Sequence, residues 1–382
     1  MKTRTSHQAL ALVGLAALAA YILACTSFSP DDSKVLYPAF DASSGRVGVA
    51  MYDRETRRSQ MVFLPVDVQG GVTNADLPSV FRAQWLDARR ILVDWAGDAL
   101  AEVSLPSGSC KLFVNLPERH DKGVESLMFP TPIAGDRVFM TAPSNELVRL
   151  DLRTGAVARH SLERPGADFG LFGAPGENAI FYSEENREGE TRRIFGRLDP
   201  ETFQRTPLLT FTNELAEGSF FTYDPRGRRA AFIEAGEEQK LVVLESGKPA
   251  FTRNLGPAKE VSFGNAVFSR KGDLLLASFR RADSPTNSSF GLMEIPLNSA
   301  PVRQMLLLRG VAADEMTALY FQVGVSHDGK TAAVASTYLA CIDPEFKAGD
   351  CALFFVSLTG ADRKVTRVPI PLPAKRSNLK HL

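Results

Sequence analysis

Short apolar runs alternate along this chain with clusters of turn-forming residues. Seven clusters of one kind are rich in Asp, Gly, Pro and Ser, and each is followed by an apolar run such as VLYPAF or LLLASF. Such residues supply the backbone conformations of tight turns, and the apolar runs have the length of strands. The clusters lie at residues 29–34, 86–90, 134–137, 175–178, 224–228, 269–273 and 326–330.

A second series of turns follows the first in register, again seven times. Most of its members come after another strand-like run, such as LVRL or ALFFV. From Asp31 to Asp328 the first series recurs about every 50 residues, close to the period of propeller blades. The second series lies at residues 53–56, 104–108, 151–155, 199–202, 245–248, 296–299 and 357–360.

The repeating unit is therefore predicted to be strand, tight turn, strand, loop, strand, tight turn, strand. Four antiparallel strands cannot bury both faces alone, so neighbouring units must stack and close into a ring. We predict an all-β fold, a seven-bladed β-propeller of four-stranded antiparallel blades over residues 25–370, with a tail at 371–382. Only Thr26 to Ser29 remain for the innermost strand of the first blade. We expect a stub there; the alternative is that the tail helps to close the ring.

Three segments carry a family resemblance: FSPDDSKVLY, FTYDPRGRRAAFIE and VSHDGKTAAVA. They resemble the TolB-like repeat, a WD-repeat-like β-propeller unit marked by an aromatic-S-P-D-G-like turn and an apolar strand. The resemblance implies interaction with proteins of the bacterial cell envelope. It assigns no partner-binding residue in this chain.

The N-terminal segment has the pattern of a signal peptide. The first eight residues carry two basic side chains and no acidic one, residues 9–24 are apolar or small throughout, and Cys25 follows. This end resembles the lipobox of bacterial lipoproteins, which implies removal of residues 1–24 and lipid attachment to Cys25. The alternatives are a transmembrane anchor and an ordinary cleaved signal. By the sorting rule of these lipoproteins, Thr26 in place of aspartate implies the outer membrane.

The charge balance argues against a nucleic-acid partner. The chain has 44 Lys and Arg and 44 Asp and Glu, and residues 1–24 contain two of the basic residues and no acidic one. The remaining chain is slightly acidic, so no net positive charge draws nucleic acid.

Two cysteines are predicted to form a disulfide. Cys341 and Cys351 flank IDPEFKAGD, which has turn formers near both ends, and facing residues of a hairpin lie within disulfide range. An exported chain can oxidise them. The alternative is a pair of reduced, packed thiols. Cys110 is then left without a partner and is expected to be a small buried residue.

Catalytic and metal motifs are missing from the sequence. The five histidines show no metal-ligand spacing, no Gly-x-Ser-x-Gly elbow is present, and no segment matches a calcium loop. We expect no cofactor and no metal. His327 is interpreted as a solvated turn residue, and the turn aspartates as side chains that cap the turn backbone.

Long, irregular connections are expected on the face of the disc opposite the tight turns, at residues 66–77, 184–193, 281–289, 312–317 and 341–351. Function concentrates on variable loops that a rigid scaffold carries. The hypothesis is that this face binds a partner, and the alternative is that these are merely solvated hairpins. The candidate partner-binding residues are Glu184, Arg187, Arg193, Arg281 and Asp283.

These observations favour a lipid-anchored, non-catalytic module that binds a protein, peptide or glycan in the cell envelope. A propeller enzyme of hydrolase or lyase type, with its site at the mouth of the central channel, is the alternative. A structural role within a multi-protein outer-membrane complex is a third possibility.

Overall fold

The structure is a computed structural model. It describes residues 26–41, 46–62, 80–95, 99–105, 110–113, 131–134, 136–142, 146–162, 168–173, 180–186, 192–212, 221–224, 228–234, 237–245, 248–312, 319–338, 352–360 and 363–370.

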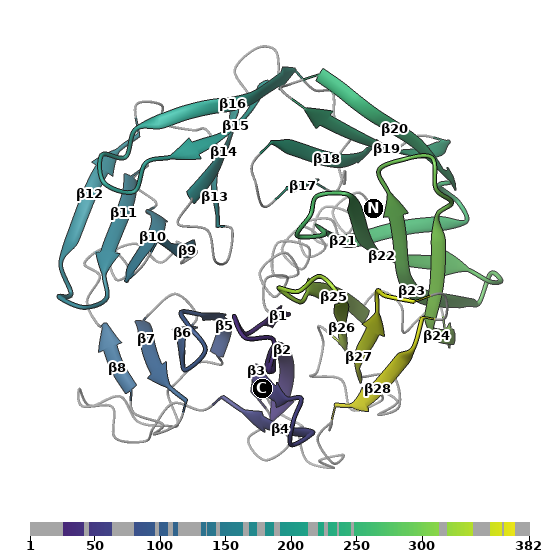
Figure 1. Cartoon of the computed structure of the whole chain (residues 1–382), viewed down its shortest axis with the longest axis horizontal. Coiled ribbons are helices and arrows are strands. Elements are labelled where there is room, and N and C mark those ends of the chain that lie inside the picture. Colours follow the sequence, from purple (N-terminus) through teal and green to yellow (C-terminus); the bar gives the residue numbers. More distant parts are fainter. Residues whose placement is uncertain are drawn as a thin grey trace, which may run out of the picture.

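The described strands form seven four-stranded antiparallel sheets, arranged as blades around a central axis (Figure 1). The chain is a seven-bladed β-propeller, and the predicted fold class is confirmed. Each blade takes four consecutive described strands, and none of these strands comes from the other end of the chain.

The strands of the first four blades have these bounds: β1 (Ser27–Phe28), β2 (Lys34–Asp41), β3 (Arg46–Asp53) and β4 (Arg58–Met61) in blade 1; β5 (Val80–Trp85), β6 (Arg90–Trp95), β7 (Ala99–Ser104) and β8 (Cys110–Phe113) in blade 2; β9 (Thr131–Ala134), β10 (Arg137–Ala142), β11 (Glu146–Asp151) and β12 (Val157–Ser161) in blade 3; β13 (Asp168–Gly173), β14 (Ile180–Asn186), β15 (Arg192–Leu198) and β16 (Arg205–Thr212) in blade 4.

The last three blades have these: β17 (Phe221–Tyr223), β18 (Arg229–Glu234), β19 (Glu238–Glu245) and β20 (Lys248–Pro257) in blade 5; β21 (Val261–Phe268), β22 (Leu274–Ala282), β23 (Asn287–Pro296) and β24 (Arg303–Ala312) in blade 6; β25 (Leu319–Val325), β26 (Thr331–Tyr338), β27 (Ala352–Ser357) and β28 (Val365–Pro369) in blade 7.

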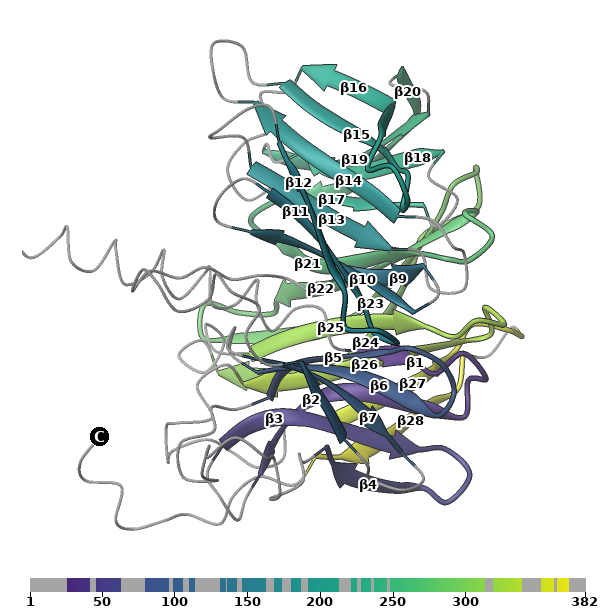
Figure 2. The same ribbon diagram turned by 90° about the vertical axis from the view of Figure 1, so that its left-hand side faces the viewer.

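Both predicted series of turns fall where the repeat requires them. The first series connects the first and second strands of each blade, and the second connects the third and fourth. Because the strands are antiparallel and consecutive, all these tight turns lie on one face of the disc, which we call the turn face. The other connections lie on the opposite face, the loop face. Figure 2 shows the disc edge-on, with strands crossing between the two.

The hydrophobic core lies between neighbouring blades. In β2, Val35 and Tyr37 pack in a cluster with residues of blade 7, whereas Leu36 between them packs with Ile91 and Val93 of blade 2. Successive strand residues point to opposite faces, so a strand buried on both sides must be apolar at every position. This explains why the second strands read as continuous apolar runs.

The innermost strand of blade 1 is the stub that the sequence predicted. β1 has two residues, whereas β25, its neighbour in blade 7, has seven. The tail, residues 371–382, lies outside the described residues.

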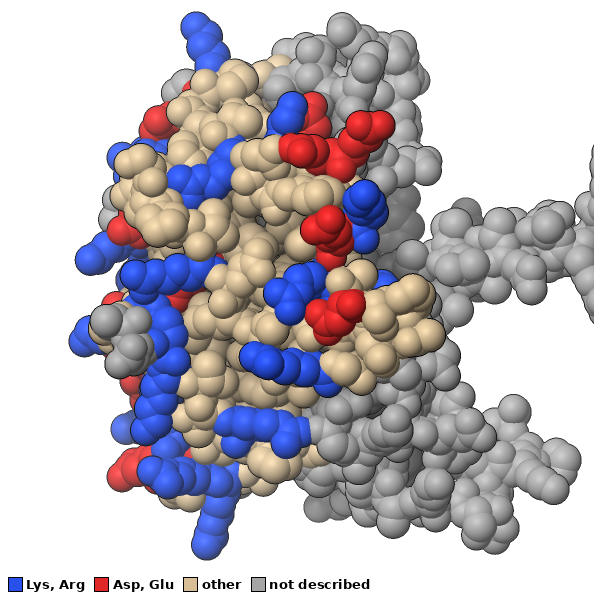
Figure 3. All heavy atoms as spheres, turned by 90° about the vertical axis from the view of Figure 1, so that its right-hand side faces the viewer, with Lys and Arg blue, Asp and Glu red and all other residues tan. Residues whose placement is uncertain are grey.

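Charged side chains are unevenly distributed over the rim of the disc beside blades 5 to 7. Figure 3, which views the rim beside blades 5 to 7, shows Lys and Arg side chains gathered along one edge. No helix among the described residues is long and apolar enough to cross a membrane.

Candidate functional site

Three tight turns on the turn face are built around a buried serine, and two of them meet where the ring closes. The serines begin the turns of blades 1, 6 and 7 and are at most 7% exposed. Each hydroxyl accepts a hydrogen bond from the backbone N–H five residues later and donates one to an aspartate of its own turn. Oγ of Ser29 lies 2.9 Å from the backbone nitrogen of Lys34 and 2.6 Å from Oδ1 of Asp31. Oγ of Ser269 lies 3.2 Å from the nitrogen of Leu274 and 2.7 Å from Oδ1 of Asp273. Oγ of Ser326 lies 2.9 Å from the nitrogen of Thr331 and 2.7 Å from Oδ1 of Asp328.

These bonds change the acidity of two turn aspartates. Partial burial raises the pKa of Asp31, but hydrogen bonds from Ser29 and Ser33 outweigh it, so the pKa lies below its ordinary value. Burial likewise raises the pKa of Asp328, and hydrogen bonds from the Ser326 hydroxyl and the Lys330 N–H bring it below the ordinary value. Both carboxylates cap the turn backbone, as predicted.

The fourth position of each serine turn has a left-handed backbone. It is Gly272 in blade 6 and Gly329 in blade 7, with φ of 70° and 69°, but Asp32 in blade 1, with φ of 58°. For a residue with a Cβ atom, this left-handed conformation is about 1–2 kcal/mol less stable than the right-handed one. Aspartate is one of the few residues other than glycine that adopt this conformation, because its short side chain can form a stabilising interaction with nearby backbone groups.

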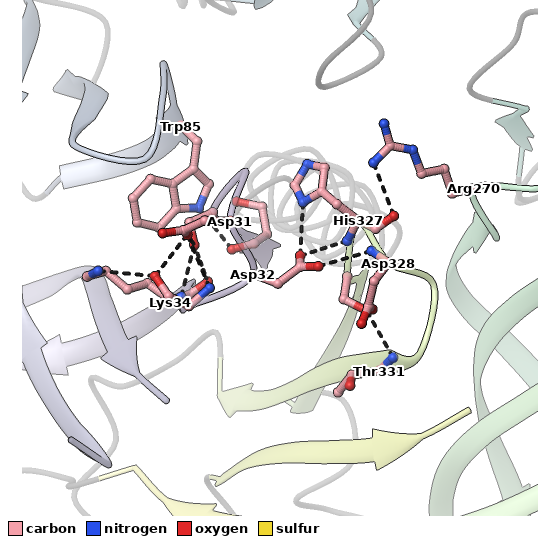
Figure 4. Close-up of polar contacts among 12 residues, drawn as sticks. Asp31, Asp32, Lys34, Trp85, Arg270, His327, Asp328 and Thr331 are labelled. Atoms are coloured by element: carbon pink, nitrogen blue, oxygen red, sulfur yellow. Dashed lines mark hydrogen bonds and ion pairs between the residues drawn. The ribbon is translucent and has the colours of Figure 1, made fainter. Parts of the chain in front are cut away.

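The carboxylate of Asp32 supplies that interaction by joining blade 1 to blade 7 (Figure 4). Oδ1 accepts a hydrogen bond from the backbone N–H of His327 at 2.7 Å and lies 3.0 Å from Nδ1 of its ring. Oδ2 accepts one from the backbone N–H of Asp328 at 3.0 Å. The side chains of Asp32 and His327 are only 16% and 17% exposed. The interpretation of His327 as a solvated turn residue is therefore wrong.

Further contacts hold the stub strand β1 on the blade 7 side. The hydroxyl of Thr26 donates a hydrogen bond to Oε1 of Gln322 at 3.1 Å. Gly324 lies so close to the carbonyl oxygen of Thr26 that an added Cβ would stand 2.5 Å from it. The absence of a side chain at Gly324 is thus what lets β1 pack against β25.

β1 is also bound on its other side. The indole Nε1 of Trp85 in blade 2 donates a hydrogen bond to the carbonyl oxygen of Ser27 at 3.1 Å. Within blade 1, Nη1 of Arg54 donates to the carbonyl oxygen of Asp32 at 2.7 Å, and its guanidinium lies 5.6 Å from the ring centre of Phe28. A two-residue strand is therefore fixed by contacts to both neighbouring blades.

Basic side chains link other blades on the turn face in a similar way. Arg149 of blade 3 donates to the carbonyl oxygen of Pro200 in blade 4 at 2.7 Å, and Arg253 of blade 5 to that of Ala300 in blade 6 at 2.8 Å. Between blades 6 and 7, Arg270 donates to the carbonyl oxygen of His327 at 3.1 Å. These bonds tie together the turns of blades 3 and 4, of blades 5 and 6, and of blades 6 and 7.

The structure places one predicted partner-binding residue differently. Glu184 belongs to strand β14 rather than to the loop after it, and it is 7% exposed. Its Oε2 lies 3.0 Å from Nη1 of Arg205 on the outermost strand of the same blade. The placement of Glu184 in an exposed loop is wrong, because the strand continues through it and a buried carboxylate requires a basic partner.

Two other candidates lie near one another on the loop face. Arg281 is the penultimate residue of β22, and Asp283 follows that strand directly. Nη2 of Arg281 lies 3.2 Å from Oδ1 of Asp283, and the hydroxyl of Ser289 donates to Oδ2 of the same carboxylate. Their binding of a partner stays a prediction.

The remaining candidates are not placed in full. Arg193 lies in β15, and its side chain is outside the described part of the structure. Cys110 lies in β8, with its side chain likewise undescribed. Arg187, Cys25, Cys341 and Cys351 lie outside the described residues, so lipid attachment and the disulfide stay predictions.

The described residues bring no catalytic constellation together. Among them, no group of three or more His, Cys, Asp or Glu side chains could hold a metal ion. The polar arrangement of Asp32 with the turn of His327 joins two blades. The role of this arrangement is structural: its hydrogen bonds close the ring between blades 1 and 7.

Asp32 is one of the turn aspartates interpreted from the sequence as caps of their own turn, and its contact with blade 7 was not predicted. A signal for it existed: in two of the three serine turns the fourth position is glycine, and in the first it is aspartate. An aspartate at a position that favours glycine indicates that its side chain has a specific partner. The sequence could not show that the partner lies almost 300 residues away.

Comparison with known proteins supports the fold and goes no further. No protein-family model and no curated protein sequence matches the chain. A solved structure from a study of two prolyl endopeptidases has 13% identity and a TM-score of 0.57, covering 98% of this chain and 55% of that one. KlHsv2 with loop 6CD replaced by a Gly-Ser linker has 10% identity and a TM-score of 0.50, covering 91% and 98%. The chain thus spans about half the length of the prolyl endopeptidase, and at such identities the likeness concerns the fold alone.

Proposed function

We propose that the protein is a lipid-anchored binding or scaffold module of a bacterial cell envelope. It is attached to the outer membrane through Cys25 and recognises a protein, peptide or glycan partner without catalysis. The resemblance of FSPDDSKVLY, FTYDPRGRRAAFIE and VSHDGKTAAVA to TolB-like repeats supports a role in envelope protein interaction.

The observation that carries the proposal is the position of Thr26. This residue is 8% exposed and is already bonded to Gln322 in the last blade. It directly follows the cysteine that the lipobox-like sequence marks for lipid attachment. An anchor at Cys25 therefore joins the membrane to a rigid ring with almost no linker, which suits a protein that presents a fixed surface.

The polar side chains at the contact between blades 1 and 7 support a non-catalytic role, because they bind each other. Asp32 and His327, which in another setting would be candidates for acid–base chemistry, bind each other across the ring closure. No described cluster favours the alternative, a propeller enzyme.

The anchor is tested with Cys25→Ser, using Cys110→Ser as the matched control. The full chain is produced in a bacterium with two membranes and fed an alkyne-tagged fatty acid. We expect the parent chain and Cys110→Ser to carry the tag and to sediment with membranes, and Cys25→Ser to do neither. Retention of Cys25→Ser on membranes without the tag would mean that the leader is the anchor.

A further inference from the structure

The direction of β1 determines which face of the disc a lipid on Cys25 can reach. The first strand of every blade runs from the loop face to the turn face, because the tight turn follows it. Thr26 precedes β1, so the chain before it comes from the loop-face side of the channel. Consecutive Cα atoms are about 3.8 Å apart, which keeps Cys25 beside Thr26.

The depth of Thr26 strengthens this constraint. Thr26 lies beside Gln322, the fourth residue of β25, and not beside Leu319, where β25 begins near the loop face. About three residues of β25, roughly 10 Å of strand, separate Gln322 from that end. A lipid on Cys25 therefore leaves through the loop-face mouth of the channel, and the turn face points away from the membrane.

The turn face carries a basic surface on blades 5 to 7. The charged side chains considered are those of the tight turns and of the strand residue on either side of each turn. Among the described residues these turns and flanking positions contain four acidic side chains, Asp224, Glu245, Asp273 and Asp328, and nine basic ones, Arg228, Arg229, Lys248, Arg270, Lys271, Arg303, Lys330, Arg363 and Lys364. In Figure 3, the edge along which Lys and Arg side chains gather is the turn-face edge of these blades.

The loop face of the same blades has the opposite balance. The described connections there, with their flanking residues, contain one basic side chain, Lys259, and five acidic ones, Glu234, Glu237, Glu238, Glu260 and Asp283. Among the described turns and connections of these blades, the excess of basic side chains therefore lies on the turn face.

The acidic groups of the basic surface are largely occupied within the fold. Asp224 is 2% exposed, Asp273 accepts the hydroxyl hydrogen of Ser269, and Glu245 lies 3.4 Å from Arg229. Glu245, Asp273 and Asp328 are exposed, and so are Lys248, Lys271 and Lys364, one on each blade. The excess of basic over acidic side chains therefore faces solvent. Exposed charges of one sign on a fixed scaffold attract a partner of the other sign.

The turns that carry these residues form one continuous surface. Arg229 of blade 5 donates to the carbonyl oxygen of Gly272 in blade 6 at 2.9 Å, and Arg270 of blade 6 donates to that of His327 in blade 7 at 3.1 Å. Within blade 7, the N–H of Leu358 donates to the carbonyl oxygen of Lys330 at 2.8 Å, which joins its two turns.

We infer that the basic turn surface of blades 5 to 7 is the partner-binding surface and that it binds an acidic segment of another protein. The inference rests on the proposed anchor for its orientation. Because the anchor places the membrane on the loop-face side, an anionic bilayer is not the occupant of this surface. The inferred partner contact is therefore on the turn face, whereas the sequence favoured the loop face.

The test uses the full chain in detergent and fluorescent poly-L-glutamate as the acidic probe. The turn-face variant is Lys248→Glu, Lys271→Glu and Lys364→Glu combined. The matched control reverses three exposed charges near the loop face of blades 5 and 6: Lys240→Glu, Lys259→Glu and Arg309→Glu. Circular dichroism and thermal unfolding show whether each variant keeps the fold.

We expect the turn-face variant to bind the probe at least about tenfold more weakly and the control to stay within about twofold of the parent chain. Binding by the parent chain should weaken as NaCl rises above about 0.1 M, where the Debye length falls below about 10 Å. Absence of binding by the parent chain at low salt, or equal loss in both variants, would overturn the inference.

A second arm separates this inference from the anchor proposal. Cys25→Ser should bind poly-L-glutamate as the parent chain does, whatever the outcome of the lipid-labelling experiment. The same variant is mixed with phosphatidylglycerol vesicles. If it binds these vesicles through Lys248, Lys271 and Lys364 but does not bind poly-L-glutamate, the surface is a membrane site and the inference is wrong.

Discussion

Oδ1 of Asp32 lies 2.7 Å from the backbone nitrogen of His327, so a side chain of the first blade accepts a hydrogen bond from the last. Among the described strands, none from one end of the chain joins the blade formed by the other end. Closure of the ring depends on side-chain contacts such as this one and on the packing of a two-residue strand. The seam between blades 1 and 7 is therefore the place where small changes should have large effects.

Replacement of Asp32 by glycine is expected to destabilise the protein. It removes three hydrogen bonds that join the blades, two of them from backbone N–H groups. Hydrogen bonds between partly exposed groups contribute about 0.5–1.5 kcal/mol each, and relief of the left-handed backbone returns about 1 kcal/mol. We expect a net loss of about 1–3 kcal/mol in the free energy of unfolding, measured by urea titration.

Asp31→Gly is the control for that experiment, because the hydrogen bonds of Asp31 stay within its own turn. Hydrogen exchange should speed up in β1 and β25 for Asp32→Gly and only within the blade 1 turn for Asp31→Gly. Unchanged exchange in β25 after Asp32→Gly would show that the seam does not depend on this carboxylate.

Gly324→Ala is expected to loosen β1. The added Cβ would stand 2.5 Å from the carbonyl oxygen of Thr26, and backbone cannot rotate away as a side chain can. Overpacking of this kind costs about 1–3 kcal/mol. Gly264→Ala, on the innermost strand of blade 6, meets only the hydroxyl of Ser278 and should cost less. Equal thermal stability of the two variants would contradict the packing at the seam.

The serine turns make stability depend on pH in the acid range. Asp31 and Asp328 have pKa values below the ordinary value in the folded state. Such groups stabilise the fold fully above the unfolded pKa of about 3.9, and this contribution is lost as pH falls through the folded pKa.

Ser326→Ala removes a hydrogen bond that lowers the pKa of Asp328. The free energy of unfolding of the variant should therefore fall less steeply than that of the parent chain between about pH 4 and pH 2. Asp328→Asn should flatten the dependence in the same way. Equal slopes for all three proteins would show that this carboxylate does not couple to folding.

Much of the fold could be predicted because the blade repeat is local. Tight turns reveal themselves through Asp, Gly, Pro and Ser, and strands buried on both sides through continuous apolar runs. The short β1 followed from counting residues between Cys25 and the first turn. In contrast, the partner of Asp32 depends on which blades meet after the ring closes, and sequence spacing carries no information on a contact of that range.

Glu184 shows a different limit of sequence reading. The stretch from Glu184 is polar and resembles a solvated loop, yet β14 runs to Asn186 and the Glu184 carboxylate is buried against Arg205. A charged residue inside a strand can be stabilised by a partner from the next strands, and a polar pattern alone does not mark where a strand ends.

The cysteine pair offers an independent check on the exported state. We expect Cys341 and Cys351 to resist alkylation until a reductant is added, whereas Cys110 has no predicted partner. Replacement of both by serine should lower the free energy of unfolding by roughly 2–3 kcal/mol, because so short a loop loses its cross-link. Free thiols at both positions in protein from the envelope would refute the disulfide.

The most direct test of this account is the distance of each face from the bilayer. The full chain is placed by its own anchor on vesicles that contain a lipid-borne quencher, with a fluorophore introduced through an unnatural amino acid at position 259 on the loop face or 271 on the turn face. We predict strong quenching at the position of Lys259 and weak quenching at that of Lys271. Quenching at 271 equal to or stronger than at 259 would contradict the orientation, and with it the assignment of the turn face to the partner.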